Sequence, residues 1–121
     1  MLKDNFFNIL GKSKEESGEL VYRVKINAGH DIFKGHFPGQ PISPGVCNVQ
    51  MVKECAEDAL GSKLMISNLK QCKFTQLLIP TVNSEVDVRL QISEGEVVTI
   101  KGQISEGESK FMDMKAEAVK E

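Results

Sequence analysis

The residues best suited to chemistry lie between Phe33 and Ala56. No Asp, Glu, Lys or Arg occurs from Gly35 through Val52, although these residues make up 26% of the chain. An uncharged run of this length indicates burial, because a charge taken out of water without a partner is very costly. Within the run stands His36. Imidazole is the side chain whose ordinary pKa lies nearest neutral pH, so His36 is the first candidate for proton transfer.

Two further polar side chains, Asn48 and Gln50, follow in the same uncharged stretch. Buried polar groups must find hydrogen-bond partners, and for Asn48 a structural role of this kind is the favoured interpretation. A lone histidine in a Gly/Pro turn is also more often structural than catalytic, so His36 needs further support. The second histidine, His30, is expected at the surface.

A helix must position these residues. Ser43 can cap it and Pro44 can occupy its first turn, where proline is best tolerated. The pattern predicts that this helix runs to about Leu60 and stops at Gly61. Its first half is uncharged on every side, while charged residues crowd its second half, so one end is buried and the other reaches solvent.

The rest of the chain is mostly strand-like. Hydrophobic residues alternate with polar ones in several segments, as they do in half-buried strands. A short helix with Asp4 as N-cap and a polar loop at 12–18 are expected before the first of them. The predicted helices span 4–10 and, after the cap Ser43, 44–60, and the predicted strands span 19–28, 64–78, 82–92, 97–104 and 110–119. One helix packed on an antiparallel meander predicts an α+β domain.

Irregularities are also predicted in the strand-rich part. The strand at 64–78 has room for a bulge near Asn68 to Gln71. The pentapeptide Ile-Ser-Glu-Gly-Glu occurs twice, at 92–96 and 104–108. Both copies are interpreted as hairpin turns, since glycine supplies the positive φ that such turns need.

Bulk properties narrow the classes of protein. At 121 residues, the chain 1–121 is expected to form a single domain. Its net charge of -2, with both signs interspersed, argues against nucleic-acid binding. Neither a bilayer-spanning apolar run nor a signal peptide is evident, so a soluble cytoplasmic protein is expected.

The three cysteines, Cys47, Cys55 and Cys72, are expected to be reduced, and Cys47 and Cys55 to be small core side chains. A nucleophilic role would need a low thiol pKa that nothing nearby suggests. With two histidines and no Cys-x-x-Cys pair, no metal site is expected.

The segment Gly35-His36-Phe37-Pro38-Gly39-Gln40-Pro41-Ile42-Ser43-Pro44-Gly45-Val46 resembles the signature of the bacterial 3-hydroxyacyl-[acyl-carrier-protein] dehydratases. These are hotdog-fold enzymes, in which an antiparallel sheet wraps around one central helix. Strand, Gly/Pro turn, buried helix and C-terminal strands follow in that family's order. Lys73-Phe74 also resembles the family's basic-Phe element in the strand after the helix. The resemblance therefore implies a hotdog fold for most of the chain.

The implied reaction removes water from a 3-hydroxyacyl thioester, which requires a base, an acid and donors for an enolate-like oxygen. His36 would be the base. The free N–H groups at the helix start would stabilise the oxygen, and Gly45 matches the family residue whose amide does so. In the family a carboxylate lies fourteen residues after the motif histidine, whereas Gln50 stands there in this chain. An amide can hold the hydroxyl or the leaving water, but it cannot act as an acid.

Other residues near the site have weaker assignments. Glu54 lies one turn beyond Gln50 and could partly substitute for the missing carboxylate. The favoured interpretation of Glu54 is a solvated charge, because charged helix residues are mostly exposed. Phe33 and Phe37 are expected to be packing residues that could also line an acyl pocket. The resemblance places them, with Pro44, Val46 and Glu54, among the substrate-binding candidates.

The resemblance implies an acyl carrier protein with a phosphopantetheine-linked substrate as partner, no cofactor, and a role in fatty-acid or related acyl-chain synthesis. It also implies a homodimer or higher even oligomer, in which Gln50 of one subunit faces His36 of the other. Two alternatives stay open. The change to Gln50 motivates a binding protein for acyl carrier protein or acyl thioesters that has lost dehydration. A thioesterase on the same fold would need a carboxylate, for which Glu54 is the only nearby candidate.

Overall fold

The computed structural model describes residues 2–33 and 42–121. One α-helix and six strands account for most of this length. In chain order the elements are β1 (Phe7–Lys14), β2 (Leu20–Ile26), the short 3-10 helix η1 (Asp31–Phe33), α1 (Gly45–Leu60), β3 (Leu64–Phe74), β4 (Glu85–Glu94), β5 (Val98–Glu106) and β6 (Ser109–Lys120).

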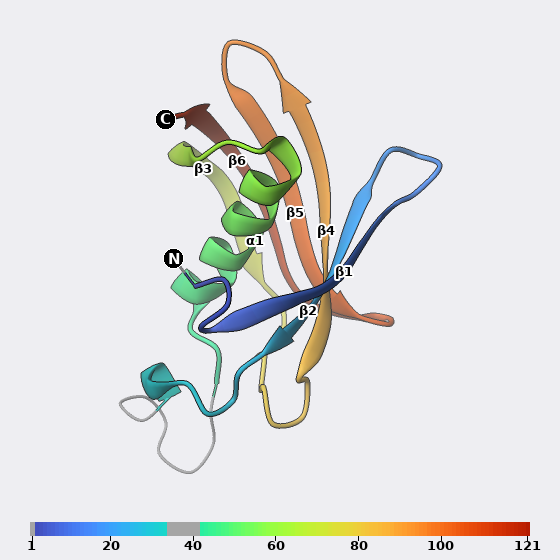
Figure 1. Cartoon of the computed structure of the whole chain (residues 1–121), viewed down its shortest axis with the longest axis vertical. Helices are drawn as coiled ribbons and strands as arrows, with labels where there is room; N and C mark the ends of the chain where they lie inside the picture. The colour runs from blue at the N-terminus through green and yellow to red at the C-terminus, as the bar shows by residue number, and fades with distance from the viewer. Residues whose placement is uncertain (1, 34–41) are drawn as a thin grey trace.

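The six strands form one antiparallel sheet in the order β1-β2-β4-β5-β6-β3. The sheet curves around α1, which lies along its concave face and contacts β4, β5 and β3 (Figure 1). The β1–β2 hairpin forms the end of the sheet opposite β3. The predicted arrangement, an antiparallel sheet around one helix, is confirmed.

Gly102 in β5 lets the helix pack closely on the sheet. A Cβ atom built on Gly102 would lie 2.4 Å from Cγ1 of Val52, a fully buried residue of α1. Only a residue without a side chain permits this approach. In the uncharged half of the helix Cys47, Asn48, Met51 and Val52 are buried, whereas Val46 is exposed, so the predicted burial of this end holds only in part.

The C-terminal half of α1 is joined to β1 and β2 by polar contacts at Asp58. Its carboxylate accepts a hydrogen bond from the Tyr22 hydroxyl at 2.8 Å and pairs with the Lys12 ammonium at 2.9 Å. The hydrogen bond from Lys12 lowers the pKa of Asp58, while burial and then the neighbouring carboxylate raise that of the Tyr22 hydroxyl. The charged half of the helix is therefore bonded to the sheet as well as solvated.

The predicted helix over 4–10 is wrong. Asp4 has a φ of 67° and lies in a turn, and β1 begins at Phe7. Phe6 and Phe7 are fully buried, and β1 pairs with β2 from Phe7 to Lys14, so the predicted loop at 12–18 is also partly strand. Pairing with β2 satisfies the backbone of a segment whose local signals favoured a helix.

The later strands are confirmed, with ends that differ by a few residues. The predicted bulge in β3 appears as two register shifts against β6, between Ile66 and Asn68 and between Leu69 and Gln71. Both Ile-Ser-Glu-Gly-Glu copies connect hairpin strands, β4 to β5 and β5 to β6. Only the second uses a positive φ, at Gly107.

The helix begins one residue later than predicted. Pro44 is its N-cap residue and supplies no side-chain hydrogen bond, while Gly61 ends it in the left-handed conformation as expected. The Ser43 hydroxyl donates instead to Oδ1 of Asn48, at 2.6 Å. Both residues are buried, so Ser43 and Asn48 satisfy each other beneath the first turn.

We predict that Gly102→Ala lowers the free energy of unfolding by about 1 to 3 kcal/mol, because the added methyl group must displace the packed Val52 side chain. Urea denaturation followed by circular dichroism measures the change. Gly95→Ala is the matched control, since its built Cβ meets nothing closer than the Val97 carbonyl oxygen at 3.6 Å. Equal stability of Gly102→Ala and wild type would contradict the packing argument.

Candidate functional site

The helix start is the part of the candidate site that the structure shows most directly. No described residue accepts a hydrogen bond from the N–H groups of Gly45 or Val46. The N–H groups of Cys47 and Asn48 are already bonded to the Pro44 carbonyl. The unpaired donors and the positive end of the helix dipole can stabilise a negative oxygen placed there.

An aromatic side chain lies against this helix start. A Cβ atom built on Gly45 would lie 2.8 Å from Cζ of Phe74, the last residue of β3. The Phe74 ring is 52% exposed, and Val46 beside it is 75% exposed. Glycine at position 45 therefore lets an aromatic ring from the sheet approach the helix backbone. Phe74 therefore lies at the candidate site. The sequence alone did not indicate its contact with Gly45.

Gln50 and Glu54 form a hydrogen-bonded pair one turn apart on α1. The Gln50 side-chain amide donates from Nε2 to Oε2 of Glu54 at 2.7 Å. Leu2 N–H donates to both carboxylate oxygens, at 3.0 and 2.8 Å, and Lys3 N–H donates to Oε1 at 2.8 Å. Both oxygens of Glu54 are thus occupied by N–H donors.

The expectation that Glu54 is solvated is wrong. Its side chain is 1% exposed. Burial of a carboxylate is tolerated here because two backbone N–H groups and the Gln50 amide replace its water. The sequence could not show this, since the N-terminal donors lie about fifty residues away along the chain.

Other predicted site residues fall into two groups. His36 and Phe37 lie outside the described residues. Phe33 is buried and packs its ring on Phe6, with centroids 5.6 Å apart, so the packing interpretation accounts for it. Pro44, the N-cap residue, is half-buried.

His30 is half-buried rather than at the surface. Its ring meets Phe6 edge-on, and its Nδ1 accepts a hydrogen bond from Ile32 N–H at 3.0 Å. These contacts give the described histidine a structural role.

The cysteines carry no disulfide. Burial raises the pKa of the Cys47 thiol, and burial followed by Asp58 and Glu54 raises that of Cys55 to about 12. A raised pKa leaves less thiolate at neutral pH, so neither thiol is suited to nucleophilic attack. This agrees with the prediction that both are core side chains.

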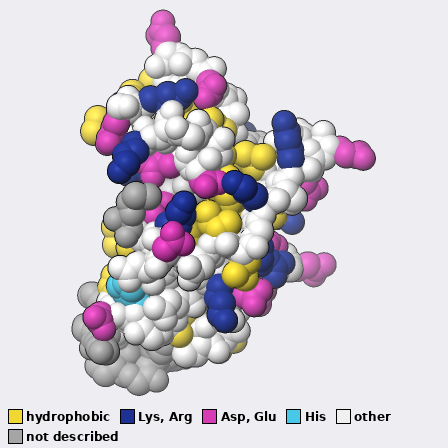
Figure 2. Space-filling view, in the orientation of Figure 1, with side chains coloured by type: hydrophobic (Ala, Val, Ile, Leu, Met, Phe, Trp, Pro, Cys, Tyr) yellow, Lys and Arg dark blue, Asp and Glu magenta, His cyan; other side chains and the backbone are white. Residues whose placement is uncertain are grey.

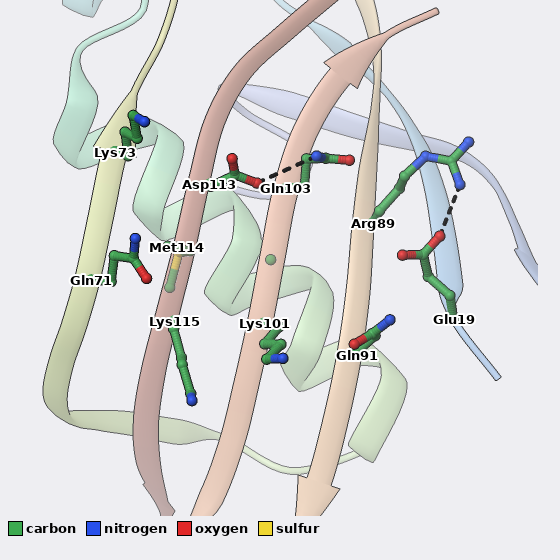
Figure 3. Close-up of a pocket in the computed structure, with 11 residues that line it drawn as sticks. Glu19, Gln71, Lys73, Arg89, Gln91, Lys101, Gln103, Asp113, Met114 and Lys115 are labelled. Carbon is green, nitrogen blue, oxygen red and sulfur yellow. Dashed lines mark hydrogen bonds and ion pairs between the residues drawn. The ribbon is translucent and has the colours of Figure 1, made fainter. Parts of the chain in front are cut away.

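A recess lies on the outer face of the sheet, on the side away from the helix. It is a groove of about 390 Å³ across β3, β6, β5 and β4 (Figure 3). Lys101 and Lys115 are directly opposite each other on β5 and β6, and no described carboxylate forms an ion pair with either. The sheet separates this groove from α1, so it is not part of the candidate site.

On the face that carries the helix, basic and acidic side chains alternate without a patch of one sign (Figure 2). The described residues contain no cluster of His, Cys, Asp or Glu side chains suited to holding a metal ion. Among the helices they form, none is long and apolar enough to cross a membrane.

Comparison with solved structures identifies the fold. The dehydratase heterocomplex ApeI:P from Xenorhabdus doucetiae superposes with a TM-score of 0.65 at 21% identity, covering 91% of this chain and 95% of that chain. With one helix inside a six-stranded antiparallel sheet, the protein is a hotdog-fold protein.

Sequence comparison identifies the family. Residues 12–112 match the ApeI-like family, described as ApeI dehydratase. The 3-hydroxyacyl-[acyl-carrier-protein] dehydratase FabZ of Ruminiclostridium cellulolyticum is 32% identical over 116 residues, covering 84% of this chain and 82% of that protein. FabZ of Acetivibrio thermocellus is 29% identical over 111 residues, covering 79% and 76%. The chain belongs to the dehydratase family that includes FabZ and ApeI.

We predict that Lys101→Glu stabilises the protein by roughly 0.5 kcal/mol, because it replaces a like-charged cross-strand pair with an opposite-charged one. Urea denaturation at low salt measures the gain, which should shrink at high salt. The double variant Lys101→Glu/Lys115→Glu restores like charges and should lose the gain. A gain retained in the double variant would show that the opposed lysines do not repel appreciably.

Proposed function

We propose that this protein removes water from 3-hydroxyacyl thioesters of an acyl carrier protein, giving 2-enoyl thioesters in fatty-acid or related acyl-chain synthesis. The observation that carries the proposal is the match of residues 12–112 to a dehydratase family, with α1 beginning at Gly45, within the motif at 35–46, and without a side-chain cap from Pro44. Family membership supplies the reaction class, and the helix start supplies the donors it needs.

The proposed roles follow from the chemistry of each group. His36 takes the proton from C2 of the substrate. The Gly45 N–H donates to the thioester oxygen as negative charge develops on it. Gln50 holds the 3-hydroxyl group, and Val46 and Phe74 provide exposed apolar surface beside the thioester. No cofactor is required for these steps.

The thioesterase alternative receives no support from Glu54. A general base for hydrolysis needs a free lone pair within hydrogen-bond reach of a water molecule. Both Glu54 oxygens accept from N–H donors, and the side chain is buried. The non-dehydrating binding protein stays the second candidate, because Gln50 occupies the position of the expected carboxylate.

We propose further that the protein is a homodimer joined through β3. This strand lies at one end of the sheet, where β6 is its only strand partner among the described residues. It also exposes apolar side chains, with Met65 53% and Leu69 44% exposed. An exposed, apolar edge strand favours pairing with another chain. The family resemblance implies that in such a dimer Gln50 of one subunit faces His36 of the other.

We predict that the pure protein converts 3-hydroxyacyl-acyl-carrier-protein to the 2-enoyl product, and that His36→Ala lowers the rate by about 10² to 10⁴-fold through loss of the base. Mass spectrometry of the carrier-bound product measures conversion over several chain lengths. His30→Ala is the matched control, because that ring packs on Phe6 and its loss should reduce stability but leave the rate. Binding without enoyl product would favour the binding protein, and release of free thiol the thioesterase.

We predict that Met65→Lys shifts the protein from dimer to monomer, since a charge at the paired edge would be buried without a partner. Sedimentation velocity measures the mass. Leu10→Lys is the matched control, with a residue 51% exposed on β1, the opposite edge of the sheet. A monomeric wild type, or dissociation by Leu10→Lys instead, would rule out the β3 interface.

A further inference from the structure

The Gln50–Glu54 hydrogen bond determines which end of the Gln50 amide is available to a ligand. A side-chain amide has one donor end and one acceptor end. Glu54 accepts N–H groups at both oxygens, so a carboxylate faces Gln50 and only the Nε2 end can bond to it. No described residue donates to Oε1 of Gln50, and Gln50 is half-buried.

We infer that Glu54 is a positioning residue that holds Gln50 as a hydrogen-bond acceptor for the substrate hydroxyl. This inference depends on the proposed dehydration. Rotation of the amide would place its oxygen against the Glu54 carboxylate and lose the 2.7 Å hydrogen bond. Glu54 is held in turn by the N–H groups of Leu2 and Lys3, so its own rotation would leave backbone donors unpaired.

An acceptor at this position changes how the hydroxyl leaves. The substrate O–H donates to Oε1 of Gln50, which leaves the lone pairs of the hydroxyl oxygen free to receive a proton. The C2–H bond breaks and its proton passes to His36, the C2=C3 bond forms, and the C3–O bond breaks with its electron pair on oxygen. The imidazolium then returns the proton to that oxygen, and water departs. One titratable side chain thus serves as both base and acid, with no carboxylic acid in the proton transfer.

The test compares Glu54 with Glu57, a half-buried glutamate of the same helix. Glu57, like Glu54, accepts a backbone N–H, from Leu64 at 2.8 Å, whereas the Gln50 amide hydrogen bond goes to Glu54. We predict that Glu54→Gln lowers kcat by roughly 10 to 100-fold with less than about 3-fold change in KM, since small displacements of a positioning group act mainly on the reacting geometry. Glu57→Gln should lose comparable stability and keep kcat. Equal kcat loss in both variants, or none in Glu54→Gln, would overturn the positioning role.

An exchange variant tests the direction of the hydrogen bond. Gln50→Glu/Glu54→Gln restores one amide and one carboxyl group with their places reversed. It should recover part of the kcat lost in Glu54→Gln and add a pH dependence from the new carboxyl group, measured as kcat/KM against pH. A profile identical to that of the wild type would contradict an acceptor at position 50.

A measurement without turnover separates this inference from the proposed reaction. The side-chain NH₂ signals of Gln50, assigned by NMR, should show slowed solvent exchange in the wild type and in Glu57→Gln, and fast exchange in Glu54→Gln. Slowed exchange together with no dehydration would refute the reaction and retain the orientation of Gln50. Fast exchange in the wild type would refute the orientation whether or not the enzyme turns over.

Discussion

The contact of one helix with the concave face of one sheet is the interaction on which the rest of the structure depends. The N-terminal half of α1 carries no charge, and the sheet that curves around the helix covers one side of it, which holds the buried residues Met51 and Val52. The Val52–Gly102 contact sets how close the two come at the centre. Because the helix carries Gly45, Gln50 and Glu54, the packing of the helix on the sheet also sets where these three groups of the candidate site lie.

The site combines a donor region and an acceptor region on the same rigid element. The N–H groups of Gly45 and Val46, which have no acceptor among the described residues, lie at the first turn of α1, and Gln50 follows a little over one turn later. Since both belong to one helix, the helical hydrogen bonds fix the separation of their backbone positions, and the hydrogen bond to Glu54 holds the Gln50 amide. Such an arrangement suits a substrate that carries a carbonyl oxygen and a hydroxyl group two carbons apart.

Much of this could be predicted from the chain alone. Alternation in the last three strands, the uncharged helix and Gly61 as its stop are local signals, and the structure bears them out. The helix predicted for 4–10 was wrong because its capping signal is local. The pairing with β2 and the burial of Phe6 and Phe7 are tertiary contacts that this signal does not reflect. Propensity gives way to such contacts.

The site itself shows the same division. The motif placed Gly45 and Gln50 correctly on the helix, because the spacing of residues along one helix can be predicted from the sequence. The burial of Glu54 and the Phe74 ring over Gly45 were not readable, since each depends on a residue that meets the helix only in three dimensions. Charged residues are usually exposed, and only the partners reveal an exception.

The attachment of Leu2 and Lys3 to Glu54 has a consequence for the N-terminal segment. The backbone amides of these two residues are held by a carboxylate inside the protein. Residues added ahead of Leu2, such as an affinity tag, would therefore join a segment that supports the Gln50 pair. A tag carried at the other end of the chain leaves that support untouched.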